Sequence, residues 1–284
     1  MPIPSSGSLG VDRINFEFNE TSSNTAQVDL SDMSKYVGKS AGQTVSFADF
    51  RNKPEYIEYY ESVTPSTSTY TVGSFNIGQP APNRKLLIVL LRSGGFGTMN
   101  MTGSTITVNG STVATTTLAN TPVTNNYLSV RVLFTNSYVT SGTTATASVT
   151  TSSIRNGDQY VYVMPLYGMV GGQRKGAVTN NDYRRPVNFE IGTMTKRGMF
   201  FGGVWHELHT PGSTATWSTT FGTPTVWKEQ QNPGDLQWYR SLCYYDNRDQ
   251  PTNDILPITA TFNSNDTTTK SSASVAFSCF ISEE

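Results

Sequence analysis

Hydrophobic and polar positions alternate along much of this chain with the two-residue period of a β-strand. Residues 85–91 are the exception, because they are apolar almost throughout and predict a strand buried on both faces. Asn109 and Gly110 stand between two alternating runs and predict a tight hairpin. Other predicted strands cover residues 70–72, 75–77, 127–134, 144–149, 160–166, 187–191, 199–208, 214–221, 242–245, 258–262 and 275–281.

Turn-forming residues separate these runs, and no alternation of strands with long helices occurs between them. The chain after the N-terminal segment is long enough for one large β domain or two small ones. The arrangement of strands and turns predicts an all-β fold in which residues 70–284 form one antiparallel β-sandwich or jelly-roll-like domain. Residues 168–182 are rich in Gly, Asn, Arg and Lys, which predicts an exposed loop.

The first 53 residues have a different pattern. Residues 28–33 and 45–50 are two copies of one phrase, which reads apolar, polar, apolar, small, Asp, apolar. The few apolar residues here lie among Ser, Thr, Asn and Gly, so the segment cannot offset its ordering entropy by burying itself. We therefore predict that residues 1–53 form an extended arm that docks on another surface. Its expected contact residues are Leu9, Val28, Leu30, Met33, Val45, Phe47 and Phe50.

Residues 54–69 are predicted to join the arm to the sandwich. Residues 54–61 begin with a proline followed by a glutamate, which favours the first turn of a short helix. Residues 64–69 contain only Thr, Pro and Ser and are typical of a linker. We expect at most this one helix in the chain.

Composition and charge narrow the possible functions. Hydrophobic residues make up 36% of the chain and charged residues 14%, and the abundance of Ser, Thr, Asn and Gly argues against a helical protein. The net charge of -1, with only small groups of Lys and Arg at 173–175 and 184–185, argues against nucleic acid as a partner. The longest apolar run is too short to span a membrane, and the N-terminus does not resemble a signal peptide. We expect a soluble protein that is not exported by the general secretory route.

Motifs for catalysis or metal binding are weak. Residues 92–97 form a glycine-rich segment after a predicted strand, but no helix follows to bind a phosphate. His206 and His209 are three residues apart on a predicted strand, so they point to opposite faces and do not match a zinc motif. We predict no enzyme activity, metal or cofactor. Cys243 and Cys279 are interpreted as buried free thiols, with a single bridge as the alternative.

Aromatic residues concentrate in the last third of the chain, where all four tryptophans lie. Trp227 and Trp238 flank the polar residues 228–235, and Tyr239 follows. Rings beside hydrogen-bonding groups suit contact with a glycan or with another protein. The alternative is that these rings fill a sandwich core or a subunit contact, and we favour it because aromatic pairs commonly stabilise sheets.

The arm resembles the N-terminus of tailed-bacteriophage structural proteins. Residues 3–9 read Ile-Pro-Ser-Ser-Gly-Ser-Leu, and residues 29–32 and 46–49 resemble the repeated "isoleucine-serine-leucine-serine-aspartate" phrases of that family, although the second copy has Phe and Ala. The later chain is similar to the sandwich domain of such virion proteins. The segments that carry this similarity are residues 90–95, 107–110, 197–203 and 271–280.

The resemblance implies a virion protein of the tail, in the baseplate, tail tip or fibre attachment, that is assembled in the host cytoplasm. It implies that the arm docks on other virion proteins and that the chain forms a homo-oligomer, a trimer or a ring. One alternative is a receptor-binding fibre protein that recognises host surface polysaccharide, and another is a capsid decoration protein. A polysaccharide-degrading enzyme is less favoured, because no repeat longer than the arm phrase is visible.

Overall fold

The computed structural model describes the chain from Tyr56 onward, with gaps. The described residues are 56–81, 83–93, 100–120, 128–167, 169, 173–174, 178–179, 187–194, 198–207, 215–219, 222–231, 238–246, 256–264 and 274–282. The predicted arm lies outside them, as do its contact residues Leu9, Val28, Leu30, Met33, Val45, Phe47 and Phe50.

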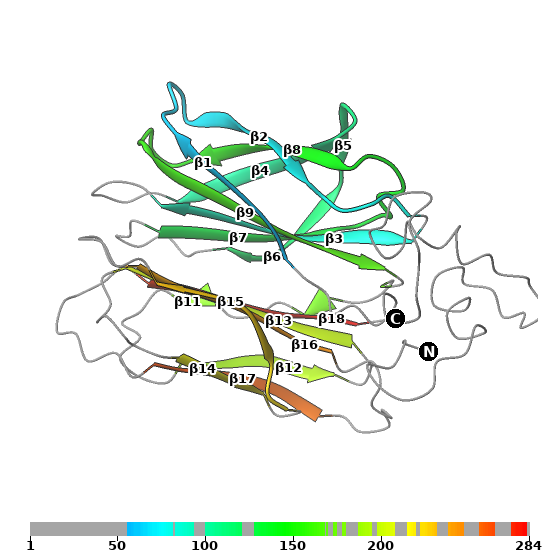
Figure 1. The fold of residues 1–284 in the computed structure, drawn as a ribbon, viewed down its shortest axis with the longest axis vertical. Helices are drawn as coiled ribbons and strands as arrows, with labels where there is room; N and C mark the ends of the chain where they lie inside the picture. The colour runs from blue at the N-terminus through cyan, green and yellow to red at the C-terminus, as the bar shows by residue number, and fades with distance from the viewer. Residues whose placement is uncertain are drawn as a thin grey trace, which may run out of the picture.

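Every regular element in the described ranges is a β-strand, and the strands form antiparallel sheets stacked in four layers (Figure 1). This confirms the predicted all-β, antiparallel sandwich class. The first half of the chain forms two of the layers. Inner sheet 1 has the order β1 (Ile57–Val63), β9 (Gly157–Tyr167), β3 (Arg84–Ser93), β7 (Leu128–Thr135) and β6 (Thr115–Asn120). Outer sheet 1 has the order β2 (Thr69–Asn76), β8 (Thr144–Thr151), β4 (Met101–Val108) and β5 (Ser111–Val113).

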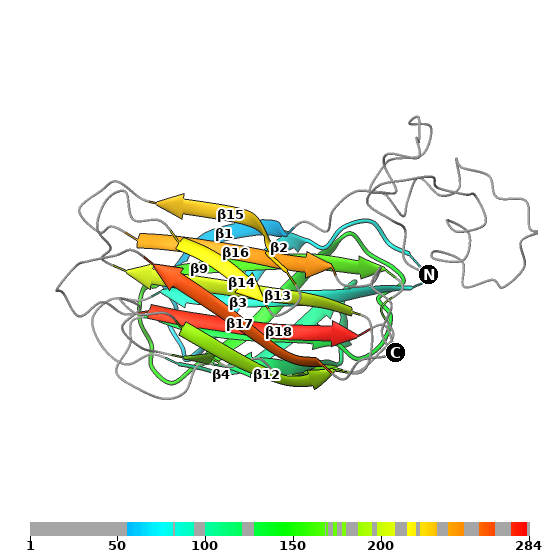
Figure 2. The same cartoon turned by 90° about the horizontal axis from the view of Figure 1, so that it is seen from below.

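The second half of the chain forms the other two layers. Inner sheet 2 has the order β10 (Gln173–Arg174), β18 (Ser274–Ser282), β13 (Gly198–Glu207), β16 (Trp238–Asp246) and β15 (Thr225–Gln231), and β11 (Val178–Thr179) also pairs with β18. Outer sheet 2 has the order β12 (Val187–Met194), β17 (Leu256–Ser264) and β14 (Ala215–Thr219). Seen from below, its strands run obliquely across those of inner sheet 2 (Figure 2).

The two halves share one connectivity. In the first half, β1 lies beside the last strand β9, and β2 lies beside β8. In the second half, the short strands β10 and β11 both lie beside the last strand β18, and β12 lies beside β17. If β10 and β11 are counted as one interrupted strand, both halves have the connectivity of a jelly roll. The order β1-β9-β3-β7-β6 has its counterpart in β10-β18-β13-β16-β15, and β2-β8-β4 has its counterpart in β12-β17-β14. The one sandwich expected over residues 70–284 is therefore two stacked sandwiches. The first of them begins with β1, before residue 70.

The most apolar segment of the sequence occupies the centre of inner sheet 1. Nine of the ten residues of β3 are buried, because outer sheet 1 covers one face and inner sheet 2 covers the other. This confirms the strand predicted at residues 85–91. The predicted hairpin is also present between β4 and β5, where Asn109 and Gly110 have φ values of 49° and 75°. Positive φ at both central residues is what an Asn-Gly hairpin turn requires.

The short helix predicted over residues 54–61 is wrong where the structure describes it. Residues from Ile57 onward form β1, which pairs with β9 along its whole length, from Ile57 opposite Val163 to Val63 opposite Gly157. The segment is rich in Ile, Tyr and Val, which favour strands, and β9 supplies the hydrogen-bonding partner that the sequence pattern does not reveal. The tertiary contact therefore overrides the weak helix-start signal.

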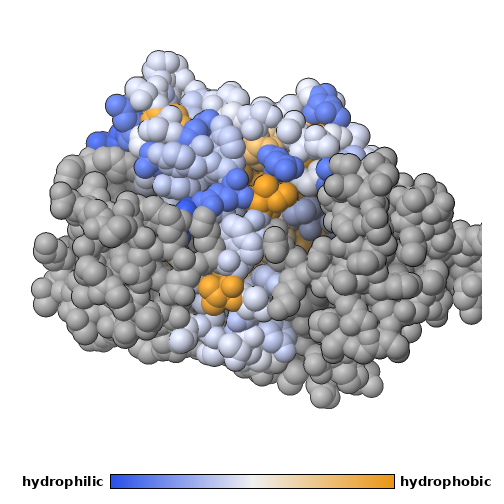
Figure 3. Space-filling model, viewed as in Figure 1, coloured by the Kyte–Doolittle hydropathy of each residue, from blue (hydrophilic) through white to orange (hydrophobic). Residues whose placement is uncertain are grey.

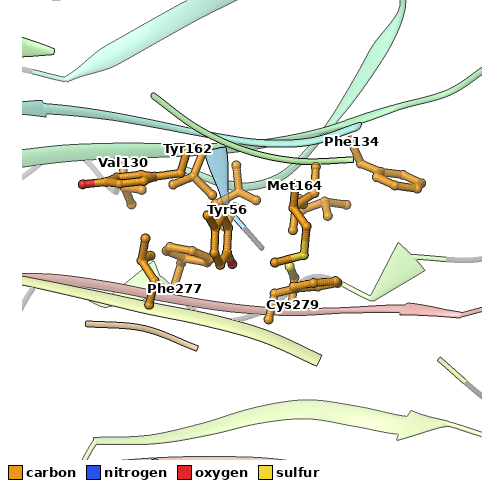
Figure 4. Packing of buried hydrophobic residues seen from close by; sticks show 14 of the residues in the cluster. Tyr56, Val130, Phe134, Tyr162, Met164, Phe277 and Cys279 are labelled. Atoms are coloured by element: carbon orange, nitrogen blue, oxygen red, sulfur yellow. The ribbon is translucent and has the colours of Figure 1, made fainter. Parts of the chain in front are cut away.

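The two inner sheets meet face to face with their strand orders reversed. Tyr56, which precedes β1, contacts Trp227 on β15, and Tyr162 on β9 contacts Arg240 on β16. At the other side β18 contacts β7 and β6. We call this interface between the inner sheets the seam. Figure 4 shows side chains such as Phe134 and Met164 packing toward Phe277 and Cys279 across it.

The cysteines are free and buried, which confirms the favoured interpretation. Cys243 on β16 and Cys279 on β18 are separated by β13, so roughly 9.5 Å of sheet lies between their backbones. They also point to opposite faces, because Cys279 belongs to the seam whereas the Cys243 sulfur lies beside Trp217 of outer sheet 2 at Gly202. A disulfide needs a much closer approach, so this geometry excludes a bridge between them.

Candidate functional site at one edge of the seam

A buried arginine ties the two sandwiches together at the edge formed by β1 and β15. Arg240 is 4% exposed, and its Nη1 lies 2.5 Å from the Glu58 Oε1 atom of β1. The same Nη1 donates a hydrogen bond of 2.5 Å to the Tyr162 hydroxyl of β9. A buried cation is costly unless it is paired and hydrogen-bonded, and here both partners come from the other sandwich. Arg240 on β16 of the second sandwich is therefore joined to β1 and β9 of the first.

Aromatic rings surround the same guanidinium. Its carbon lies 5.1 Å from the ring centre of Tyr160, 5.8 Å from that of Tyr162 and 5.7 Å from that of Trp205. Such distances allow attraction between the cation and the negative faces of the rings. Arg240 is thus held by one carboxylate, one hydroxyl and three rings.

A row of three rings leads from this cluster to the surface. The ring centres of Trp205 and Tyr160 are 4.6 Å apart, and those of Tyr160 and Tyr60 are 4.8 Å apart. Exposure rises along the row from 2% at Trp205 to 7% at Tyr160 and 51% at Tyr60. Tyr60 and Tyr160 lie directly opposite each other in the pairing of β1 with β9. At the outer end, the Tyr60 hydroxyl donates to Asp158 Oδ1 at 3.1 Å.

Burial raises the pKa of two tyrosines of this cluster above the ordinary value, at which tyrosine is already neutral at pH 7. Desolvation raises the pKa of Tyr160 to about 12, with the Asp158 charge adding to the effect and Arg240 opposing it. Desolvation raises the pKa of Tyr162 further still, against the opposing effect of Arg240. Both hydroxyls therefore keep their protons at neutral pH, and their chemistry here is hydrogen bonding and ring contact.

Tyr56 inserts into the seam at the same edge (Figure 4). It is 2% exposed, and its ring centre lies 5.4 Å from that of Trp227 and 6.3 Å from that of Tyr162. Its hydroxyl is buried without a hydrogen-bond partner in the described structure, and burial raises its pKa well above the ordinary value. Tyr56 lies three residues after the end of the predicted arm, residues 1–53, so it holds the chain in the seam close to that boundary.

The Tyr56 hydroxyl, which has no hydrogen-bond partner in the described structure, leads to a testable prediction. Replacing Tyr56 with Phe keeps the ring contacts and removes a buried polar group that makes no hydrogen bond within the described ranges, so the free energy of unfolding should rise by about 1 kcal/mol. Urea titration followed by tryptophan fluorescence measures this change. The comparison variant Tyr56→Ala should lose about 3 kcal/mol, because it leaves a cavity beside Trp227. A Tyr56→Phe variant less stable than the original protein would show that the hydroxyl has a partner.

Of the three residues predicted from sequence to contact a glycan or protein, the structure describes the side chain of Trp227 alone. Trp227 is half-buried and packs against the seam, as the core interpretation requires, and Trp205 and Trp217 are buried. Trp238 and Tyr239 begin β16, directly before Arg240, with their backbones paired to Glu207 and His206. Their side chains lie outside the part of the chain that the structure describes.

The motifs of the sequence do not indicate the residues that meet at this edge, which are Glu58, Tyr60, Asp158, Tyr160 and Arg240. On the helix predicted for residues 54–61, Glu58 and Tyr60 would not face one side together. On a strand they share a face, as residues at i and i+2 do. The alternation of positions 58, 60 and 62 with 57, 59, 61 and 63 was the available signal.

Other site types have little support among the described residues. No group of three or more His, Cys, Asp or Glu side chains is placed there to hold a metal ion. A cavity of about 10 Å³ lies in the seam beside Arg240, Trp205 and Phe277, with room for about one water molecule. Within the described ranges, no helix is long and apolar enough to cross a membrane. Figure 3 shows a face whose described surface is mostly polar, with small separate hydrophobic patches.

Fold and site together define an all-β protein of two stacked sandwiches with a charged and aromatic seam. No protein-family model matches the chain, and no curated protein matches its sequence. The likeness to phage virion proteins therefore remains that of the short motifs described above.

Proposed function

We propose that this chain is a structural protein of a bacteriophage virion, located in the tail at the baseplate, tail tip or fibre attachment, and that it docks through its N-terminal arm to a neighbouring subunit. The observation that carries the proposal is the junction at Tyr56. The predicted arm of residues 1–53 carries two strand-like apolar phrases, and three residues after its end the side chain of Tyr56 is buried in the seam of the double sandwich. A firmly anchored body can hold such an arm in a fixed starting position.

The described part of the body offers little apolar surface of its own for assembly. The faces that inner sheet 1 and inner sheet 2 turn toward each other are buried in the seam. Among the described residues, only three large hydrophobic side chains are exposed, namely Tyr60, Ile154 and Val226. Stable subunit contacts usually need a larger apolar area. The Val, Leu, Met and Phe positions of the arm can supply that area when they are laid on a partner.

The fold supports this function only by analogy. Jelly rolls are frequent in viral capsid proteins and in lectins, and this chain carries the jelly-roll connectivity twice. Both uses are binding functions, in which a rigid sandwich presents loops, edges and arms. The proposed assembly is a homo-oligomer, a trimer or a ring, in which each arm contacts the next subunit.

Deleting residues 1–53 tests the proposal. The deletion leaves Tyr56 and both sandwiches in place, so the thermal unfolding temperature should change by less than about 2 °C while oligomer formation is lost. Native mass spectrometry of the full chain and the deletion variant measures assembly. In particles produced with the variant, its copy number should fall at least tenfold. Normal incorporation without the arm would overturn the proposal, and labelled particles would distinguish the tail from the capsid surface.

A further inference from the structure

The ring of Tyr60 is an exposed aromatic surface that is held in place from behind. About half of its area is exposed, while its inner face packs on Tyr160 at a centroid distance of 4.8 Å and an interplanar angle of 40°. Its hydroxyl is fixed by the hydrogen bond to Asp158. A ring held at both ends loses little conformational entropy when a ligand stacks on it.

The support behind this ring spans both sandwiches. Tyr160 packs on Trp205 of β13, and Arg240 of β16 lies over both rings and pairs with Glu58. Residues on rigid strands position a ligand more precisely than residues on loops do. The Tyr60 ring is thus the outer end of a continuous, tightly packed cluster.

A hydrogen-bond acceptor stands beside the exposed ring. Asp158 is half-buried, accepts the Tyr60 hydroxyl, and forms no ion pair in the described part of the chain. An ionised carboxylate has about four acceptor positions, of which this hydrogen bond uses one. Asp158 therefore has acceptor capacity for further hydroxyl groups on a ligand.

We propose that Tyr60 and Asp158 form a saccharide-binding platform for an uncharged hexopyranose unit. The apolar C–H face of the sugar ring stacks on Tyr60, and sugar hydroxyls donate to the Asp158 carboxylate. This inference does not depend on the arm. It moves glycan recognition from Trp227, whose ring packs against the seam, to Tyr60, the most exposed aromatic ring among the described side chains at this edge.

Charge decides among the ligand classes that an exposed tyrosine can bind. Acidic sugars are disfavoured because the Asp158 carboxylate, which forms no ion pair among the described residues, lies beside the Tyr60 ring and would repel them. Cationic ligands bind best where several rings surround them, and in this cluster Arg240 already occupies that position. What remains at the surface is one ring face and one acceptor, which fits a neutral sugar.

Saturation-transfer NMR on the full chain tests the platform. The probes are methyl glucoside, methyl galactoside and N-acetylglucosamine, with N-acetylneuraminic acid and choline as the acidic and cationic comparisons. We expect at least one neutral probe to bind with a Kd on the order of 1 mM, as a small contact area implies. Tyr60→Leu should abolish the signal, Tyr60→Phe should weaken it about threefold or less, and Asp158→Asn should weaken it about tenfold.

Ile154→Ala is the matched control, because Ile154 is 55% exposed and takes no part in the cluster. It should bind as the original protein does, and thermal unfolding of each variant checks that the sandwiches remain folded. Failure of all three neutral probes, or binding that survives Tyr60→Leu, would overturn the proposal. Preferential binding of choline or of the acidic sugar would overturn it equally. Because arm deletion leaves this surface in place, loss of arm docking and loss of sugar binding are separate results.

Discussion

Replacing Arg84 with Met should lower the free energy of unfolding by about 4 kcal/mol. Arg84 is fully buried at the start of β3, and its guanidinium donates hydrogen bonds to the carbonyl oxygens of Val139, Gly78, Ser141 and Gly142 at 2.7–3.0 Å. Methionine fills the volume of the arginine stem but donates no hydrogen bond. The loop after β2 and the loop before β8 would then lose the guanidinium that joins them. Urea titration measures the resulting change in unfolding free energy.

The arginine geometry, rather than positive charge alone, explains the effect. Arg84→Lys should recover only part of the loss, because one ammonium group cannot reach carbonyls on both loops as a planar guanidinium does. Arg131→Met is a suitable control, since Arg131 lies on β7 of the same sheet, is half-buried, and donates to the Thr117 hydroxyl. It should cost about 1 kcal/mol or less. A loss below about 1 kcal/mol at Arg84 would mean that water replaces the guanidinium.

Local patterns predicted those parts of the fold that are determined by neighbouring residues. The apolar run of β3 and the Asn-Gly hairpin of β4 and β5 both follow from a few adjacent side chains, and both were predicted at the right place. The strand β1 was missed because its conformation depends on β9, about one hundred residues away in sequence. Pairing across such a distance leaves no local signal beyond the alternation itself.

The doubling of the sandwich is not visible as a sequence repeat, and the packing explains why. The central strands β3 and β13 occupy equivalent positions, yet β3 reads RKLLIVLLRS and β13 reads GMFFGGVWHE. In β13, a Cβ atom on Gly203 would lie 2.3 Å from the Phe277 ring and 2.8 Å from Leu242. In inner sheet 2, side chains of β16 and β18 thus fill the space beside β13, whereas in inner sheet 1 the large side chains of β3 fill the equivalent space. The two sheets can therefore pack equally well with side chains of different size at equivalent positions.

The cluster at the seam edge could not be found from the sequence, because its members come from β1, β9, β13 and β16. Aromatic enrichment in the last third did identify Trp205, Trp238 and Tyr239 as a region of interest, and Arg240 follows them directly along β16. The partners Glu58 and Tyr160 had no such marker. A buried ion pair between distant segments becomes visible only when the sheets are stacked.

Replacing Arg240 with Met should cost about 3 kcal/mol of unfolding free energy, the second large effect that we expect. The change leaves Glu58 and the Tyr162 hydroxyl without their shared partner inside the seam. The cost falls at the lower end of the range for a broken buried pair, because the Glu58 side chain is 26% exposed and water can reach it. Urea unfolding followed by near-ultraviolet circular dichroism reports both stability and the packing of Trp205 and Tyr160 against the arginine.

A double-variant cycle separates the pair from its surroundings. The cost of Arg240→Met can come from the Glu58 carboxylate, which loses its ion pair with the arginine. In that case the double variant Glu58→Gln with Arg240→Met should lose about 1–2 kcal/mol less unfolding free energy than the two single variants lose in sum. If the effects simply add, the ion pair contributes nothing, and the loss comes from the three rings that surround the guanidinium. In that case Arg240→Met should cost as much in the Glu58→Gln background as it does in the original protein. The cycle therefore determines whether charge or aromatic packing holds the two sandwiches in register.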